Sequence, residues 1–232
     1  LKLNDDYRAQ MFRYTNSFKE ARFLRAYFYF NLVRAYGDVP YFTEMVTTDQ
    51  VNSLTRTPAQ EIFNAIIAEC DKLSTELPAD YTKLGLDGIA PAENGRVTCY
   101  AALALKARAA LYAASPLFNP ENNKDLWRRA AEANKEVIET CTANGFKLSK
   151  YSELWGPNNW SNNEMIFVRR YNGNISTLEE YNFPMGVPGG NSGNCPTQNM
   201  VDAYEMKATG KMWNETGSGY DASNPYAGRD PR

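Results

Sequence analysis

Aromatic and amide side chains gather in the last third of the sequence, and together they could bind a ligand that has flat apolar faces and hydroxyl groups. Flat aromatic faces stack on the apolar faces of such a ligand, which releases water from both surfaces. Amides and carboxylates nearby pair with ligand hydroxyls that would otherwise stay unsatisfied. Residues 151–232 contain three such clusters: Trp155–Asn163, Glu179–Phe183, and Met212–Asn214 with Tyr220 and Tyr226.

Sequence context separates the aromatic residues of these clusters. Trp155 follows Tyr151 and Leu154 at near-helical spacing, which favours packing in a core. Trp160 and Trp213 have polar, flexible neighbours, which favours exposed loop positions and makes both residues candidates for ligand contact. Packing in the interior remains the alternative for each. We predict ligand contacts from six residues: Asn158, Trp160, Tyr181, Asn182, Trp213 and Tyr220.

The lack of histidine limits the reactions open to the protein. It excludes Ser-His-Asp and Cys-His catalytic systems and His-ligated zinc. Two carboxylate pairs remain, Glu179–Glu180 and Asp202 with Glu205. A glycosidase holds its two carboxyl groups a definite distance apart, which adjacent residues seldom achieve, and Asp202 with Glu205 suits a solvated helix face. We therefore expect no enzymatic activity, no catalytic residue, no metal site and no cofactor.

Charge and hydropathy exclude further classes of partner. With 25 basic and 27 acidic residues, the net charge of −2 gives no basic footprint for nucleic acid. The glycines of Gly186–Gly193 lack the Lys-Ser/Thr ending of a phosphate-binding loop. No segment approaches the roughly 20 apolar residues of a membrane span.

The four cysteines stand far apart, without a C-x-x-C pair. Cys70, Cys99 and Cys141 fall in apolar helical patterns, where a free cysteine acts as a small hydrophobic side chain, whereas Cys195 does not. A disulfide between Cys70 and Cys99 stays open, because spacing alone does not decide it.

The first strong helical pattern runs from Phe18 to Tyr36. Ser17 and Glu20 form the sequence of a capping box, and Gly37 can adopt the left-handed cap. Apolar residues cover nearly the whole circumference, so we expect this helix to be buried among others. Residues 5–13 are interpreted as the end of a preceding helix.

Three more helices follow before residue 150. Thr57 and Gln60 are expected to cap the second, which ends before Pro78; the third spans 97–114 and the fourth 125–142. Aromatic and alanine-rich faces alternate among them, which is typical of stacked helix pairs of the tetratricopeptide type. The predicted fold class is mainly α, with tetratricopeptide-like stacked helix pairs, a loop-rich segment and a few short strands.

The second part of the chain differs in composition from the first. Glu164–Arg169 is rich in β-branched and aromatic residues and predicts a short strand, while Thr197–Met206 predicts a helix. Glycine and asparagine concentrate here, which indicates long loops. We expect a helical scaffold at residues 1–150 and a loop-rich, ligand-binding portion of the same domain at 151–232.

The segment Glu20–Pro40, with its crowded aromatic helix and Gly-Asp-Val-Pro exit, resembles the signature helix of the SusD/RagB family. Arginines at 22, 25 and 34 are expected to tie neighbouring helices and loops together. Further stretches follow in the family's order: Arg56–Pro58, Gly95–Thr98, Glu164–Phe167, Pro196–Met206 and Gly228–Arg232.

This resemblance implies a nutrient-binding lipoprotein at the surface of the Bacteroidetes outer membrane. Such a protein would capture an oligosaccharide or polysaccharide and deliver it to a SusC-like TonB-dependent transporter. Its membrane contact would be an N-terminal lipid anchor that precedes Leu1, and a C-terminal portion would follow Arg232. A peptide-binding RagB-type protein and a helical protein–protein adaptor remain as alternatives.

Overall fold

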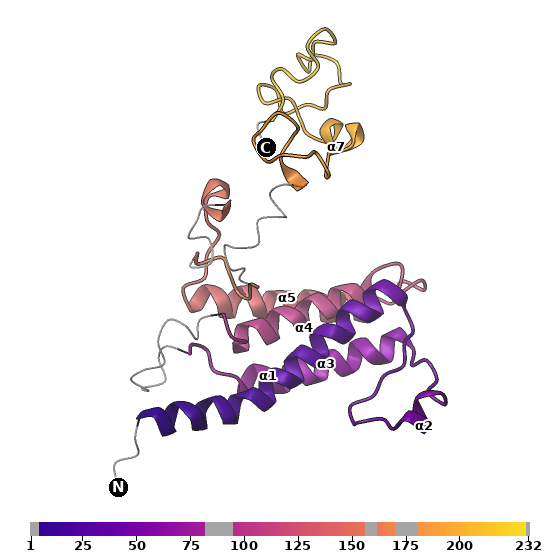
Figure 1. Ribbon diagram of the computed structural model, residues 1–232. Coiled ribbons are helices and arrows are strands. Elements are labelled where there is room, and N and C mark those ends of the chain that lie inside the picture. The colour runs from indigo at the N-terminus through magenta and orange to yellow at the C-terminus, as the bar shows by residue number, and fades with distance from the viewer. Residues whose placement is uncertain (1–4, 82–94, 156–161, 170–180, 231–232) are drawn as a thin grey trace. The chain divides into compact units, whose positions relative to one another are not determined.

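The computed structural model describes residues 5–81, 95–155, 162–169 and 181–230 (Figure 1). The chain forms two compact units, residues 1–170 and residues 171–232, which are taken separately below. The first unit is helical, and the second consists mainly of loops and turns.

The first unit contains five α-helices and one 3-10 helix among its described residues. They are α1 (Asp5–Tyr36), α2 (Thr48–Val51), α3 (Ala59–Glu76), α4 (Cys99–Ala114), α5 (Lys124–Ala143) and η2 (Tyr151–Trp155). The consecutive helices α3, α4 and α5 pack side by side, and α1 lies against α3 (Figure 1). The second unit contains α7 (Gln198–Asp202).

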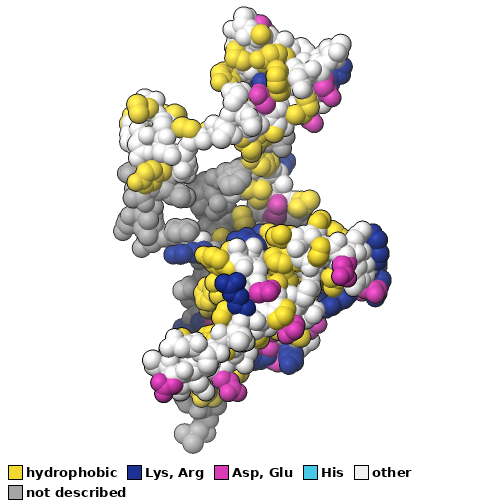
Figure 2. Space-filling model, turned by 90° about the vertical axis from the view of Figure 1, so that its right-hand side faces the viewer, with side chains coloured by type: hydrophobic (Ala, Val, Ile, Leu, Met, Phe, Trp, Pro, Cys, Tyr) yellow, Lys and Arg dark blue, Asp and Glu magenta, His cyan; other side chains and the backbone are white. Residues whose placement is uncertain are grey.

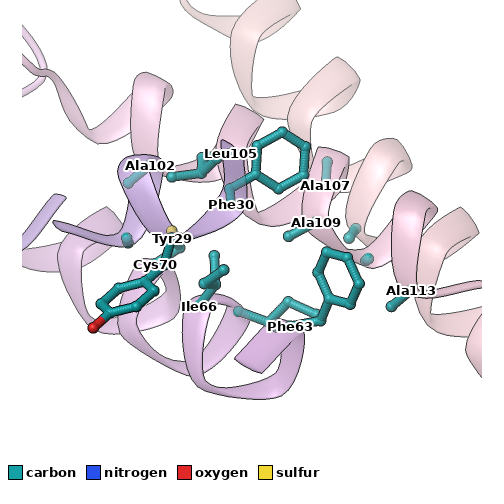
Figure 3. Close-up of a cluster of buried hydrophobic side chains, with 14 of the residues drawn as sticks. Tyr29, Phe30, Phe63, Ile66, Cys70, Ala102, Leu105, Ala107, Ala109 and Ala113 are labelled. Carbon is teal, nitrogen blue, oxygen red and sulfur yellow. The ribbon is translucent and has the colours of Figure 1, made fainter. Parts of the chain in front are cut away.

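Small side chains on α4 let the neighbouring helices come close. Alanines such as Ala102 and Ala109 are fully buried, and the rings of Phe30 and Phe63 lie beside this alanine surface (Figure 3). Phe30 also packs edge-on against Tyr112 at a centroid distance of 5.2 Å. Close packing of large and small side chains gives the core its density.

The predicted capping box at the start of the first helix is wrong. Helix α1 begins at Asp5 and continues without a break, so residues 5–13 are not a separate helix. The Ser17 hydroxyl donates instead to the carbonyl of Arg13 at 2.6 Å, a bond typical of serine within a helix. Glu20 binds partners far along the chain rather than its own helix end.

Helix α1 is buried on one side only, contrary to the expectation of full burial. Phe23, Phe30 and Val33 face the core, but Phe18 and Phe28 are 70% and 58% exposed. Among the described residues, α3 and α4 cover a single face of α1. Figure 2 shows hydrophobic side chains at the molecular surface among charged ones.

The Gly-Asp-Val-Pro exit performs three tasks. Gly37 ends α1 with a φ of 70°, a conformation that favours glycine. The Asp38 carboxylate accepts a hydrogen bond from the Ala59 N–H at 2.8 Å and so caps α3. The sequence predicts this capping role for Thr57. Val39 and Thr57 form an isolated antiparallel bridge. The predicted role of Thr57 is therefore wrong.

Gln60 is not part of a capping box either. Its Nε2 donates to the carbonyls of Ala113 and Phe118, at 2.7 and 2.8 Å. These bonds join the start of α3 to the end of α4, where the last carbonyls of a helix lack partners within the helix.

Two predictions for the C-terminal part also need correction. The segment 162–169 forms no strand, and among the described residues β-structure is limited to two isolated bridges, Val39 with Thr57 and Met206 with Arg229. Helix α7 ends at Asp202, short of the predicted Met206. Its start is as predicted, because the Thr197 hydroxyl accepts the Met200 N–H at 3.3 Å.

The arginines of α1 act as ties, as expected, at two of the three positions. Arg22 pairs with Glu69 and Glu76 of α3, and Arg25 donates to the Thr43 carbonyl. Arg34 lies over the ring of Phe30 on its own helix. Hydrogen bonding to Glu69 raises the pKa of Arg22 above its ordinary value.

All four cysteines are free, so the Cys70–Cys99 disulfide does not form. Cys70 and Cys141 are buried, as predicted for small hydrophobic side chains, whereas Cys195 is exposed. Among the described helices, none combines the length and the hydropathy that crossing a membrane requires.

Candidate functional site

The loop 181–194 of the second unit is closed by backbone hydrogen bonds. Asn194 donates its N–H to the Tyr181 carbonyl at 2.8 Å, and Ser192 donates to the Phe183 carbonyl at 3.0 Å. Two successive turns fill the space between these bonds, at Pro184–Val187 and Val187–Gly190. The loop therefore has a defined backbone on which exposed side chains can be held in place.

Tyr181 lies against the backbone of Gly193 across this closure. A Cβ atom added to Gly193 would overlap the Tyr181 ring, so the ring takes the place that a side chain would fill. Tyr181 is nevertheless 54% exposed. An aromatic ring that is held beside the backbone and remains accessible to solvent suits stacking on a pyranose.

Amide groups surround the same closure. Asn182 accepts a hydrogen bond at Oδ1 from Nδ2 of Asn194 at 3.1 Å, and Asn191 accepts the Gly193 N–H at 3.0 Å. All three asparagines are exposed. The amides of Asn191 and Asn194 have more donor and acceptor sites than these bonds use, so they can also pair with hydroxyls.

Asn194 and Gly193 are not among the ligand contacts predicted from the sequence. The enrichment of asparagine and glycine after residue 150 was the available signal, but it does not say which amides meet. Their pairing depends on the register of the loop, which the hydrogen bonds between Tyr181 and Asn194 set.

Trp213 and Tyr220 are brought together, as a pair of rings. Their centroids lie 5.4 Å apart at an interplanar angle of 64°, and both side chains are half-buried. The buried Ser218 holds the turn between them by donating to the Trp213 carbonyl at 3.1 Å. Arg229 lies over the Tyr220 ring, 5.4 Å from its centroid.

Arg229 connects this aromatic pair to α7. It forms an ion pair with Asp202 at 2.9 Å and donates to the carbonyls of Val201 and Pro225. Only 7% of its side chain is exposed. A carboxylate held by arginine in this way is occupied, which argues against Asp202 as an acid or base.

Two of the six predicted contacts, Asn158 and Trp160, lie outside the described residues. Within the described ranges, no three Cys, Asp or Glu side chains come close enough to hold a metal ion. The described site residues therefore divide into Tyr181 with Asn182 and, separately, Trp213 with Tyr220.

The helical unit has hollows of its own. One of them has a volume of about 590 Å³ and is lined mainly by Leu24, Tyr27, Phe28 and Phe167. A smaller groove of about 280 Å³ contains Lys106. Burial acts to lower the pKa of Lys106, but hydrogen bonds to acidic groups outweigh it and raise the pKa above its ordinary value.

A SusD-like family model, described as starch-binding and associating with the outer membrane, matches residues 2–111. Two SusD-like proteins of Formosa agariphila are 25% and 27% identical to the chain, over 92% and 68% of its length. The matches cover 40% and 28% of those relatives.

Solved structures agree with this result. A SusD-like protein from Bacteroides fragilis matches 92% of this chain and 41% of its own, with a TM-score of 0.69 and 27% identity. A SusD-like carbohydrate-binding protein from the same species matches 94% of this chain and 39% of its own, with a TM-score of 0.70 and 27% identity.

The chain is therefore similar to SusD-like proteins over most of its length, which confirms the resemblance predicted from its signature helix. The expected fold class, mainly α with tetratricopeptide-like helix pairs, is confirmed as well. The chain spans about two-fifths of the length of the relatives that it matches most fully. At the level of the family, the matched model stands for starch binding in association with the outer membrane.

Proposed function

We propose that this chain carries a glycan-binding surface of a nutrient-binding protein at the bacterial cell surface. The observation that carries the proposal is the exposed Tyr181 ring on Gly193, beside the paired amides of Asn182 and Asn194. This arrangement offers a flat apolar face and oriented hydrogen-bonding groups within one loop, as a sugar requires. The starch-binding description of the family model supports the same function.

The proposed activity is capture followed by transfer, without a covalent step. An oligosaccharide or polysaccharide would be held by stacking and hydrogen bonding and passed to a SusC-like TonB-dependent transporter. A lipid anchor at the N-terminus of the protein would keep it at the outer membrane. The association of the matched family with that membrane supports this location.

The predicted contacts have different roles in this proposal. Tyr181 and Asn182 form the centre, because both are exposed on the closed loop. Trp213 and Tyr220 offer a second aromatic surface that also stabilises its own turns. Trp160, with the neighbouring Asn158, completes the set of candidates.

Affinity electrophoresis of the full-length protein against a panel of polysaccharides tests the proposal. We expect retardation by at least one glycan, and loss of most of that retardation in Tyr181→Ala. Tyr151→Ala is the matched control, because Tyr151 is 55% exposed and Tyr181 54%, and Tyr151 belongs to the helical unit. Equal loss in both variants would contradict the assignment of loop 181–194.

The same assay separates the alternatives. Retardation by peptides immobilised in the gel, with none by glycans, would identify a peptide-binding RagB-type protein. Binding to a transporter subunit alone, with neither glycan nor peptide, would identify a helical adaptor.

A further inference from the structure

The segment that contains the candidate loop has an unusual distribution of charge. No lysine or arginine occurs from Tyr171 to Met206, although the whole chain has 25 such residues among 232. From Tyr181 to Val201, named here the uncharged segment, aspartate and glutamate are absent as well. Polar character in the uncharged segment therefore comes from amides, hydroxyls and the backbone.

The cations in the described part of the second unit are engaged or lie outside that segment. Arg229 is 7% exposed and paired with Asp202. The Lys211 ammonium donates to the Thr216 carbonyl at 2.8 Å, within a turn of the 206–230 region. Lys207 follows the segment and bonds through its backbone to Gly228.

Anionic sugars require cationic partners, which the uncharged segment does not contain. Sulfate and uronate groups are bound in proteins by arginine and lysine, through short charge-assisted hydrogen bonds. The face of an aromatic ring carries negative partial charge, so a ring such as Tyr181 repels an anion above it while it attracts C–H groups. An anion desolvated against the loop without a cation would lose its hydration and gain little in return.

We infer that the ligand of the uncharged segment is an uncharged glycan and that sulfated or uronate-bearing glycans bind more weakly. The inference rests on the proposed function, because it names the class of glycan at the same site. Recognition would use the C–H face of a pyranose on Tyr181 and hydroxyls on Asn182, Asn191 and Asn194.

Pairs of polymers that differ only in charge test this inference on the full-length protein. Suitable pairs are laminarin with chemically sulfated laminarin, and methyl-esterified with de-esterified homogalacturonan. The neutral member of at least one pair should retard the protein at least about tenfold more strongly than its anionic partner. Raising NaCl from about 0.05 to 0.5 M should leave the neutral interaction unchanged.

A charge introduced into the segment provides a second, independent measurement. Met185 is 79% exposed, so Met185→Lys places a cation on the loop with little change in length. We expect tighter binding of the anionic polymer by Met185→Lys than by Met185→Gln, with the gain lost at high salt. The comparison of these two variants isolates the charge.

The outcomes distinguish this inference from the function on which it depends. Stronger, salt-sensitive binding of an anionic polymer by the unaltered protein, lost in Tyr181→Ala, would overturn the inference and leave glycan binding in place. No binding to any neutral or anionic glycan would overturn the proposed function itself.

Discussion

Glu20 and Arg96 form a two-point ion pair that fastens the middle of α1 to the residues in front of α4. Arg96 Nε lies 2.8 Å from Glu20 Oε1, and Nη2 lies 2.8 Å from Oε2. The hydroxyl of Tyr81 lies 2.7 Å from the same carboxylate. Both charged side chains are mostly buried, with 16% and 23% exposed. Glu20 is thus a connector between distant segments.

Removing this carboxylate should weaken the helical unit. We expect Glu20→Ala to lower the free energy of unfolding by about 2 kcal/mol, because Arg96 then stays partly buried without its partner. Urea denaturation followed by circular dichroism measures the change. Glu121→Ala serves as the control, since Glu121 is exposed, and a loss of similar size there would contradict the assignment.

Asp38 supplies the capping acceptor for α3 from outside that helix. Asp38→Ala should cost about 1 kcal/mol of stability, because the Ala59 N–H loses its partner. Asp38→Asn keeps an acceptor oxygen at the same place and should retain most of the stability. Thermal unfolding of the two variants gives the comparison, and equal losses would show that the hydrogen bond is unimportant.

The Cys70 thiol should make stability sensitive to alkaline pH. Burial raises the pKa of this thiol from its ordinary 9.0 to about 12. Above pH 9 the Cys70 thiol of the unfolded chain releases a proton that the folded chain keeps. The unfolded state is therefore stabilised relative to the folded state as the pH rises. The contribution is complete below pH 9 and is lost at about 1.4 kcal/mol per pH unit toward pH 12.

Chemical denaturation across pH 8 to about 11 checks this slope. In Cys70→Ala the free energy of unfolding should fall less steeply with pH. The difference in slope should correspond to close to one bound proton, whatever the variant's absolute stability. An unchanged slope in Cys70→Ala would assign the pH dependence to other groups.

The helical unit was predictable where its signals are local. The apolar periodicity and Ala content of α4 and the polar start of α5 place these helices within two residues of their observed starts. Ser17 and Glu20 also match a local rule, yet Glu20 binds Arg96, which is 76 residues away. Capping rules consider only adjacent residues, so a tertiary partner of this kind overrides them.

The candidate site shows the same division. Residue type and loop context single out Tyr181 and Asn182, and both are exposed on a closed loop. Their partners Gly193 and Asn194 follow from the loop's register, which no periodicity in a glycine-rich segment specifies. Sequence alone therefore identifies the chemistry of the loop but not its geometry.

Gly193 should matter for binding because it supports the Tyr181 ring. A methyl group at this position overlaps the ring, so Gly193→Ala should displace Tyr181 and weaken glycan binding several-fold. The Gly193→Ala substitution should add little in a Tyr181→Ala background, because both changes act on one ring. Calorimetry on the two single variants and the double variant tests this, and simple additivity would contradict it.

Trp213 allows the second aromatic surface to be tested apart from the first. Its ring contacts Tyr220, which in turn lies beneath Arg229, so Trp213→Ala removes both a proposed ligand-binding face and a packing contact. We expect weaker glycan binding with the helical unit still folded, and the same result for Trp160→Ala. Calorimetry measures affinity, while circular dichroism checks that α1 to α5 persist. Unchanged affinity in both variants would remove Trp160 and Trp213 from the site and leave Tyr181 as its aromatic centre.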